Sequence, residues 1–172
     1  MAIETEEIEV STSTQTYRVY VKASPDAIWD AVTNPDQTDR YGYQGRVEYE
    51  LRPGGSYRAH APEAMRQTGS ADVIVEGEVL EAEPGRMLVQ TWSALFDEKI
   101  AAEPATRLTW ELEEGTIPWA PSVTKLTLTH ELDGAPLIAA IVGGEVPDAG
   151  GGWAYVLSDL KSLLETGTSL AG

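Results

Sequence analysis

Histidine is the side chain best suited to acid–base chemistry near neutral pH, and this sequence has two, His60 and His130, and no cysteine. His130 shares strand parity with Leu128 and Leu132, so we expect its imidazole to face the interior, where burial would lower its pKa. There it could serve a ligand or act as a general base, or it could be an ordinary hydrogen-bonded core histidine. We expect His60 to lie exposed at a strand end, without a catalytic role.

Tyrosine and tryptophan combine a flat apolar ring with one polar atom, which is typical of a pocket for a hydrophobic or aromatic small molecule. The same side chains could equally form a packed core. For Trp153 we favour packing, as an anchor of the last helix, and the inward face near Trp92 is also contested by Val89 and Thr91. The predicted ligand-binding residues are Tyr49, Tyr57, Trp92, Trp110, His130, Trp153 and Leu157.

Paired glutamates recur two residues apart on predicted strands, at positions 48 and 50, 76 and 78, and 111 and 113. Such pairs can do acid–base or metal chemistry, but strand alternation places them on the solvated face opposite the apolar one. We find no phosphate-binding glycine loop, dinucleotide fingerprint, zinc motif or nucleophile elbow. We therefore predict no metal site and no cofactor.

Charge limits the partners of this chain, because 28 acidic residues against 12 basic ones give a net charge of −16 over 172 residues. Phosphate neutralisation supplies most non-specific nucleic-acid affinity, so we expect no nucleic-acid partner. Anionic membranes are disfavoured for the same reason, and we expect no membrane insertion. The acidic N-terminus is unlike a signal peptide. The absence of cysteine fits a cytoplasmic protein. We expect a monomer or a homodimer.

Helix signals follow the first predicted strand, at 16–22. Ser24 and Pro25 suit a helix start, while Asn34-Pro35 ends that helix and begins another. Alternating apolar residues then predict six strands, with loops at 61–69 and 97–105; the strands lie around 47–51, 57–59, 73–79, 87–92, 108–112 and 126–132. Turns join successive strands, so an antiparallel meander is the simplest topology.

The last helix is predicted from the stripe of Trp153, Leu157, Leu160 and Leu164, and Gly167 suits its C-terminal cap. It is the one element long enough to cover the apolar face of the sheet.

The segment 134–150 has an apolar centre between glycines. Two interpretations of this segment stay open. It could be a mobile gate over a cavity, or a fixed element, such as a short helix, packed on the sheet edge.

Five segments of the chain resemble the SRPBCC superfamily, in the branch named for the activator of the heat-shock chaperone ATPase. They are YRVYVKASPDAIWDAVT (17–33), RPGGSYR (52–58), GEVLEAEPGRMLVQTW (77–92), TKLTLTHEL (124–132) and GGWAYVLSDLKSLLE (151–165). The resemblance implies an α+β helix-grip fold, in which a curved seven-stranded antiparallel sheet wraps around a long C-terminal helix with a cavity between them. This agrees with the element order read from the residues.

The superfamily includes START lipid-transfer domains, pathogenesis-related allergens and polyketide cyclases. We therefore expect one domain at 15–167, between a flexible tail at 1–14 and a C-terminal tail at 168–172. The favoured function is binding of a hydrophobic or amphipathic small molecule, such as a lipid, in the cavity. One alternative is a cyclase-, aromatase- or hydrolase-like enzyme that uses His130 and a cavity tyrosine. The other is a module that binds a chaperone or regulator.

Overall fold

Seven antiparallel strands form one sheet in the order β1-β7-β6-β5-β4-β3-β2 in a computed structural model that describes residues 13–172. Most of the predicted 1–14 tail therefore lies outside the described residues. The strands are β1 (Thr14–Val21), β2 (Val47–Tyr49), β3 (Ser56–His60), β4 (Val73–Glu83), β5 (Met87–Ala94), β6 (Thr106–Glu114) and β7 (Thr124–Glu131). The helices are α1 (Pro25–Thr33), α2 (Pro35–Thr38), α3 (Glu63–Gln67), α4 (Glu98–Ala101), α5 (Pro136–Val142) and α6 (Gly152–Thr166).

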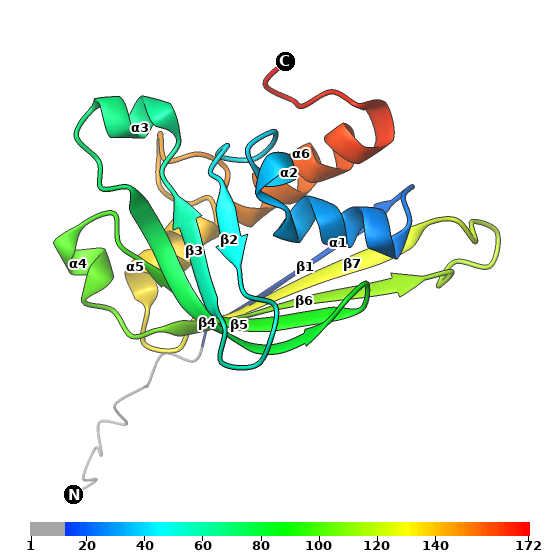
Figure 1. Cartoon of the computed structure of the whole chain (residues 1–172), viewed down its shortest axis with the longest axis horizontal. Helices are drawn as coiled ribbons and strands as arrows, with labels where there is room; N and C mark the ends of the chain where they lie inside the picture. The colour runs from blue at the N-terminus through cyan, green and yellow to red at the C-terminus, as the bar shows by residue number, and fades with distance from the viewer. Residues whose placement is uncertain (1–12) are drawn as a thin grey trace, which may run out of the picture.

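Strands β2 to β7 form the predicted meander, and β1 joins the far side of β7 (Figure 1). Register shifts in the β3–β4 pair, between Ala59 and His60, and in the β4–β5 pair, between Val79 and Glu81, mark bulges that bend and twist the strands. The curved sheet holds α6 on its concave side, with α1 and α2 beside it. The predicted helix-grip fold is confirmed.

Side-chain caps set the bounds of α1 and α2 as predicted. The Ser24 hydroxyl accepts from the Ala27 amide at 3.1 Å, and the Asn34 side chain accepts from the Asp36 amide at 3.0 Å. A proline begins each helix, where its missing N–H costs nothing. Helix α1 buries Ile28, Ala31 and Val32 against the core.

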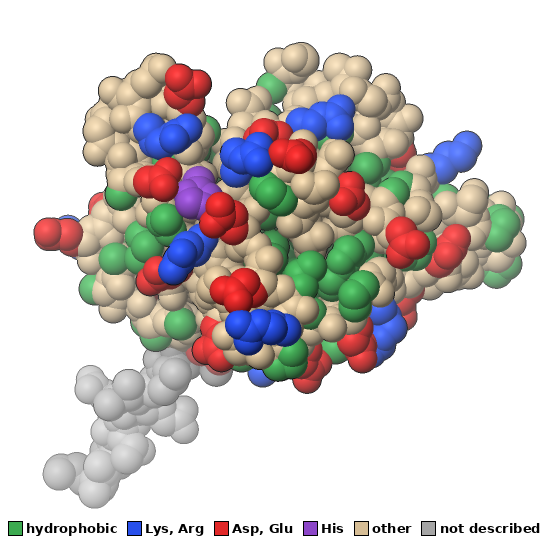
Figure 2. Space-filling model, in the orientation of Figure 1, with side chains coloured by type: hydrophobic (Ala, Val, Ile, Leu, Met, Phe, Trp, Pro, Cys, Tyr) green, Lys and Arg blue, Asp and Glu red, His purple; other side chains and the backbone are tan. Residues whose placement is uncertain are grey.

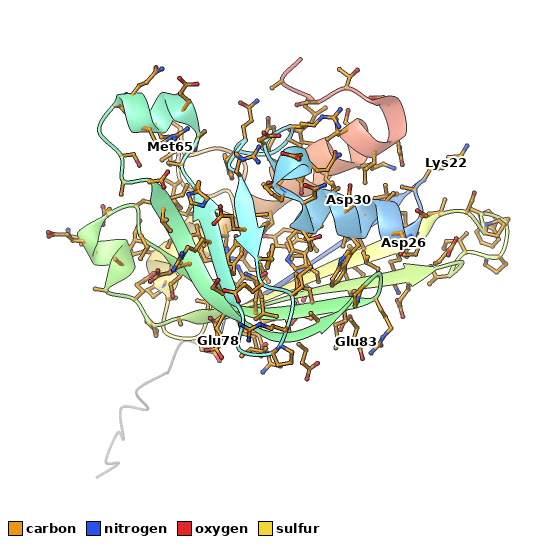
Figure 3. The ribbon with its side chains drawn as sticks, in the orientation of Figure 1. Lys22, Asp26, Asp30, Met65, Glu78 and Glu83 are labelled. Atoms are coloured by element: carbon orange, nitrogen blue, oxygen red, sulfur yellow. The ribbon has the colours of Figure 1, made fainter. Side chains whose placement is uncertain are left out.

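The glutamates predicted on the outer face are exposed on β4 and β6, opposite α6. Figure 3 shows Glu78 and Glu83 of β4 on the side of the sheet away from α1. Strand alternation therefore separates a charged outer face from an apolar inner one.

Two predicted loops each contain a short helix, α3 within 61–69 and α4 within 97–105. Asp97 caps α4 by accepting from the amides of Lys99 and Ile100, at 2.7 and 3.2 Å. No residue of α3 or α4 is fully buried. They lack the apolar stripe from which helices are recognised in a sequence, so they were missed.

Asp159 of α6 is a fully buried carboxylate. It accepts from the amides of Gly42 and Leu170, at 2.8 and 2.7 Å, and from the Ser169 hydroxyl at 3.3 Å. These bonds satisfy a charge that would otherwise be costly to bury. They also hold the loop after α2 and the predicted C-terminal tail against α6.

Candidate functional site

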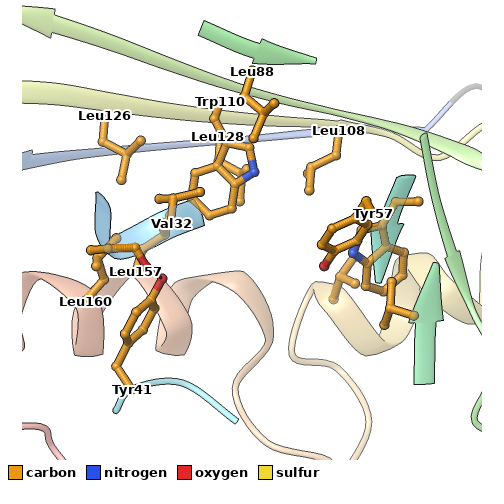
Figure 4. Packing of buried hydrophobic residues seen from close by; sticks show 14 of the residues in the cluster. Val32, Tyr41, Tyr57, Leu88, Leu108, Trp110, Leu126, Leu128, Leu157 and Leu160 are labelled. Carbon is orange, nitrogen blue, oxygen red and sulfur yellow. Dashed lines mark hydrogen bonds between the residues drawn. The ribbon is translucent and has the colours of Figure 1, made fainter. Parts of the chain in front are cut away.

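A cavity of about 500 Å³ lies between the concave face of the sheet and the N-terminal part of α6. Its wall is built by the loop after α2, the inner faces of β2 to β6, the end of α5 and the start of α6. The volume is in the range of small-molecule sites. Figure 4 shows Trp110 and Tyr57, which both line the cavity, beside the leucines of the core.

Five of the seven predicted ligand-binding residues line this cavity: Tyr49, Tyr57, Trp92, Trp110 and Trp153. The other two lie outside the wall. Leu157 is buried in the core at 3% exposure, and His130 is fully buried behind the wall. Tyr41 and Tyr43 of the loop after α2, together with Phe96, complete the aromatic lining.

Trp153 both anchors α6 and forms part of the wall. Its ring packs edge-on against Trp110 with centroids 5.8 Å apart, and it lies 6.2 Å from Trp92. Edge-to-face contacts of this kind hold aromatic rings in fixed orientations. Trp153 therefore has both of the roles considered for it. It packs against other aromatic rings as an anchor of α6, and it also lines the cavity.

His130 is neutral and fully hydrogen-bonded. Its Nδ1 accepts from the Trp153 indole N–H at 3.0 Å, and its Nε2 lies 2.7 Å from the Thr106 hydroxyl. That hydroxyl already donates its proton to the Trp92 carbonyl at 2.8 Å, so Nε2 must be the donor to Thr106. Burial lowers the pKa of His130 to about 3. The imidazole thus positions Trp153, and neither ring nitrogen is free to take a proton from a ligand.

The buried tyrosines hold their phenolic protons tightly. Desolvation raises the pKa of Tyr41, Tyr49 and Tyr57 above the ordinary value. The Tyr41 hydroxyl donates to the Ala31 carbonyl at 2.8 Å. The Tyr49 hydroxyl donates to Oε1 of Gln90 at 2.5 Å. These hydroxyls are therefore hydrogen-bond donors at neutral pH and are unsuited to act as bases.

Gln90 was not identified from the sequence, although it is fully buried on β5. A glutamine on a strand carries no motif. The sequence offers one indication of its role, which is a polar residue at an inward position of a strand whose neighbours are apolar.

The three indoles of the wall differ in their hydrogen bonds. The Trp153 N–H donates to His130. The Trp92 indole lies close enough to the Tyr57 hydroxyl to oppose part of the rise in its pKa. Trp110 is 7% exposed, and its buried Nε1 has no partner among the described residues. An unpaired buried donor costs about 1–3 kcal/mol of stability. Figure 4 shows the Trp110 nitrogen on the side of the ring that faces Tyr57.

Polar and charged residues reach the cavity at its edge. His60 ends β3 as predicted but is only partly exposed, at 23% of its side chain. Its Nε2 lies 3.3 Å from Glu48 and its Nδ1 lies 3.2 Å from Asp72. Met65 on α3 also lines the cavity, and Figure 3 places it at the end of the molecule away from α1.

The segment 134–150 contains a short helix, α5. The Glu103 carboxylate accepts from the amides of Leu137 and Ile138, at 2.9 and 2.8 Å. The Gln15 side-chain amide donates to the Ala139 carbonyl at 2.9 Å. Ile138 is buried, and Val142 at the end of the helix lines the cavity. The apolar centre of the segment is thus a helix held by two side chains. Whether that helix moves stays a prediction.

Among residues 13–172, no three His, Asp or Glu side chains cluster in a way that could hold a metal ion. No helix in the same range is long and apolar enough to cross a membrane.

A curved sheet gripping a C-terminal helix over an aromatic cavity defines a helix-grip protein, a ligand-binding fold. A family model confirms the resemblance noted in the sequence, because "Activator of Hsp90 ATPase homolog 1-like protein" matches residues 22–165. The chain belongs to this family, a branch of the SRPBCC superfamily. No curated protein matches the sequence.

Three similar solved structures illustrate the fold. CalU16 from Micromonospora echinospora is 21% identical with a TM-score of 0.62, over 91% of this chain and 78% of that one. DynU16, from the dynemicin biosynthetic locus, is 27% identical with a TM-score of 0.63, over 91% of this chain and 48% of that one. MLL2253 from Mesorhizobium loti is 19% identical with a TM-score of 0.65, over 89% of this chain and 97% of that one.

Proposed function

We propose that this protein binds a hydrophobic small molecule in the cavity between the sheet and α6. The observation that carries the proposal is the cavity itself, about 500 Å³ with a wall of tyrosine and tryptophan rings. Protein interiors are normally close-packed, with few voids larger than a water molecule. A hollow of this size removes contacts that would stabilise the fold, and a bound apolar molecule would restore them.

An enzymatic role receives less support from the geometry. His130 lies behind the wall with both ring nitrogens engaged, and the buried tyrosines have raised pKa values. A general base needs a free acceptor within hydrogen-bond reach of the substrate. Neither His130 nor the buried tyrosines offer one in this arrangement, so we favour binding over acid–base catalysis.

A chaperone-binding role would favour one broad exposed apolar patch. The large exposed apolar side chains instead come from separate elements; they are Tyr20, Tyr43, Leu51, Phe96, Trp119, Leu137 and Leu170. The cavity is therefore the stronger basis for a function than the outer surface.

The test compares dye binding by the wild-type protein with dye binding by a variant whose cavity is filled by a larger side chain. Ala59 of β3 lines the cavity, whereas Ala82 of β4 is half-buried away from it. The neutral dye N-phenyl-1-naphthylamine should gain fluorescence with the wild-type protein. Ala59→Phe should weaken dye binding at least tenfold, and Ala82→Phe should leave it within about twofold. Native mass spectrometry of freshly purified protein should also show a co-purified small molecule. Dye binding that is equal in all three proteins would overturn the proposal.

A further inference from the structure

The cavity wall offers a ligand hydrogen-bond donors and no positive charge. Among its lining residues in the described chain, only His60 and Asp97 are ionisable apart from the tyrosines, and none is lysine or arginine. Both lie toward the edge of the cavity, where Asp97 caps α4. A buried carboxylate or phosphate would therefore lose its hydration without gaining an ion pair.

The surface adds to this preference, because the chain carries a net charge of −16. Figure 2 shows acidic side chains spread across the visible face, with several beside the histidine. Such a field repels anions as they approach and does not attract them.

A buried indole donor in the wall has no acceptor among residues 13–172. The indole N–H of Trp153 is used within the protein, on His130. The Trp110 Nε1 is buried and unpartnered within the described residues, and Trp110 lines the cavity. The great majority of buried polar groups in proteins are paired, so an exception needs an explanation. A ligand oxygen that accepts from this N–H supplies one.

We infer that the ligand is an uncharged, flat, apolar molecule with a carbonyl-type oxygen that accepts a hydrogen bond from Trp110 Nε1. The flat shape follows from the walls, since Tyr49 and Tyr57 stack at 4.6 Å and the tryptophans meet edge-on. Tyr57 also lines the cavity, and its hydroxyl donates to no other residue among 13–172, so it is a second donor for such an oxygen. This inference rests on the proposed function and assigns Trp110 as the residue that determines specificity.

Three matched probes test it: 9-fluorenone with the oxygen, fluorene without it, and 9-fluorenecarboxylate with a charge. Dissociation constants come from quenching of tryptophan fluorescence. We expect 9-fluorenone to bind at least tenfold more tightly than either of the other two. Trp110→Phe should weaken 9-fluorenone about tenfold and fluorene less than threefold. Trp153→Phe is the matched control, because its N–H is already used within the protein; it should weaken both neutral probes by the same factor.

A second measurement needs no variant. In wild-type protein labelled with ¹⁵N-tryptophan, 9-fluorenone should shift the Trp110 indole proton downfield, and fluorene should not. Equal binding of 9-fluorenone and fluorene, with no selective Trp110 shift, would overturn the inference and leave the proposed function standing. Tight binding of 9-fluorenecarboxylate would also overturn it. Failure of both neutral probes to bind would count against the proposed function, and the inference would fall with it.

Discussion

The two ends of α6 lie over different parts of the sheet and are packed differently. Toward its C-terminus, α6 packs against β1 and α1, and Leu160 belongs to the same core as the completely buried Val21, Leu126 and Leu128. Toward its N-terminus, Trp153 and Val156 border the cavity. The same helix therefore closes a solid core at one end and a hollow at the other.

The side-chain types account for this difference. Branched aliphatic side chains interdigitate and fill space to crystal-like density. Aromatic rings are rigid and meet edge-on, as Trp110 and Trp153 do, so they can form walls around a space. Stability is thus concentrated at the aliphatic end, and the aromatic end is available for binding.

The largest expected effect is at the solid end. Leu160→Ala should lower the free energy of unfolding by about 2–5 kcal/mol, because it leaves a void among fully buried neighbours. Urea denaturation followed by circular dichroism measures the loss. Binding of the neutral dye should persist below the unfolding transition. A loss under about 1 kcal/mol would show that this end collapses easily and that the contrast is wrong.

The next effect is a pH dependence of the free energy of unfolding, caused by His130. The pKa of His130 is about 3 in the folded protein and about 6.5 when unfolded. Only the unfolded state takes up a proton between these values, so the stability present above pH 6.5 is lost as the pH falls toward 3. Between pH 7 and pH 5 the loss should be about 2 kcal/mol.

Urea denaturation at the two pH values measures this loss, and His130→Gln should remove it. His60→Gln, at the cavity edge, is the matched control and should retain the loss due to His130. An NMR titration in which His130 protonates near pH 6.5 would contradict the buried network.

A smaller effect compares two valines of β4. Val79 is completely buried outside the cavity wall, and Val75 lines the cavity. Both alanine variants lose the transfer free energy of the deleted methyl groups, but only Val79→Ala creates a new void. We expect Val79→Ala to cost about 1 kcal/mol more than Val75→Ala in denaturant unfolding. Equal costs would mean that the cavity closes around a smaller side chain.

The smallest effect concerns α5, whose end borders the hollow. Its first turn is held by Glu103, and Gln15 binds the Ala139 carbonyl. We expect amides in 138–142 to exchange faster than those of the last two turns of α6, since local opening here breaks few buried contacts. Saturation with the neutral dye should slow them severalfold if this helix is a gate. Slow exchange in the empty protein, unchanged by the dye, would identify a fixed element.

The sequence by itself determined the order of the strands, the positions of α1, α2 and α6, and the inner faces of β6 and β7. Local rules set these features: Ser24 and Asn34 cap their helices whatever lies around them, and strand alternation places Trp110 and His130 on the same side as the leucines. The family resemblance then added the curved topology. Five of seven predicted ligand-binding residues reached the cavity wall for this reason.

Only the tertiary structure decided which inward side chains border open space. Leu157 and Trp153 lie on the same helix one turn apart, yet only Trp153 reaches the cavity. His130 is inward-facing, but Trp153 covers its Nδ1 and Thr106 occupies its Nε2. The free donor on Trp110 is likewise invisible in the sequence, because hydrogen-bond satisfaction depends on neighbours that are distant along the chain. Periodicity records the direction of a side chain, and only packing determines what that side chain meets.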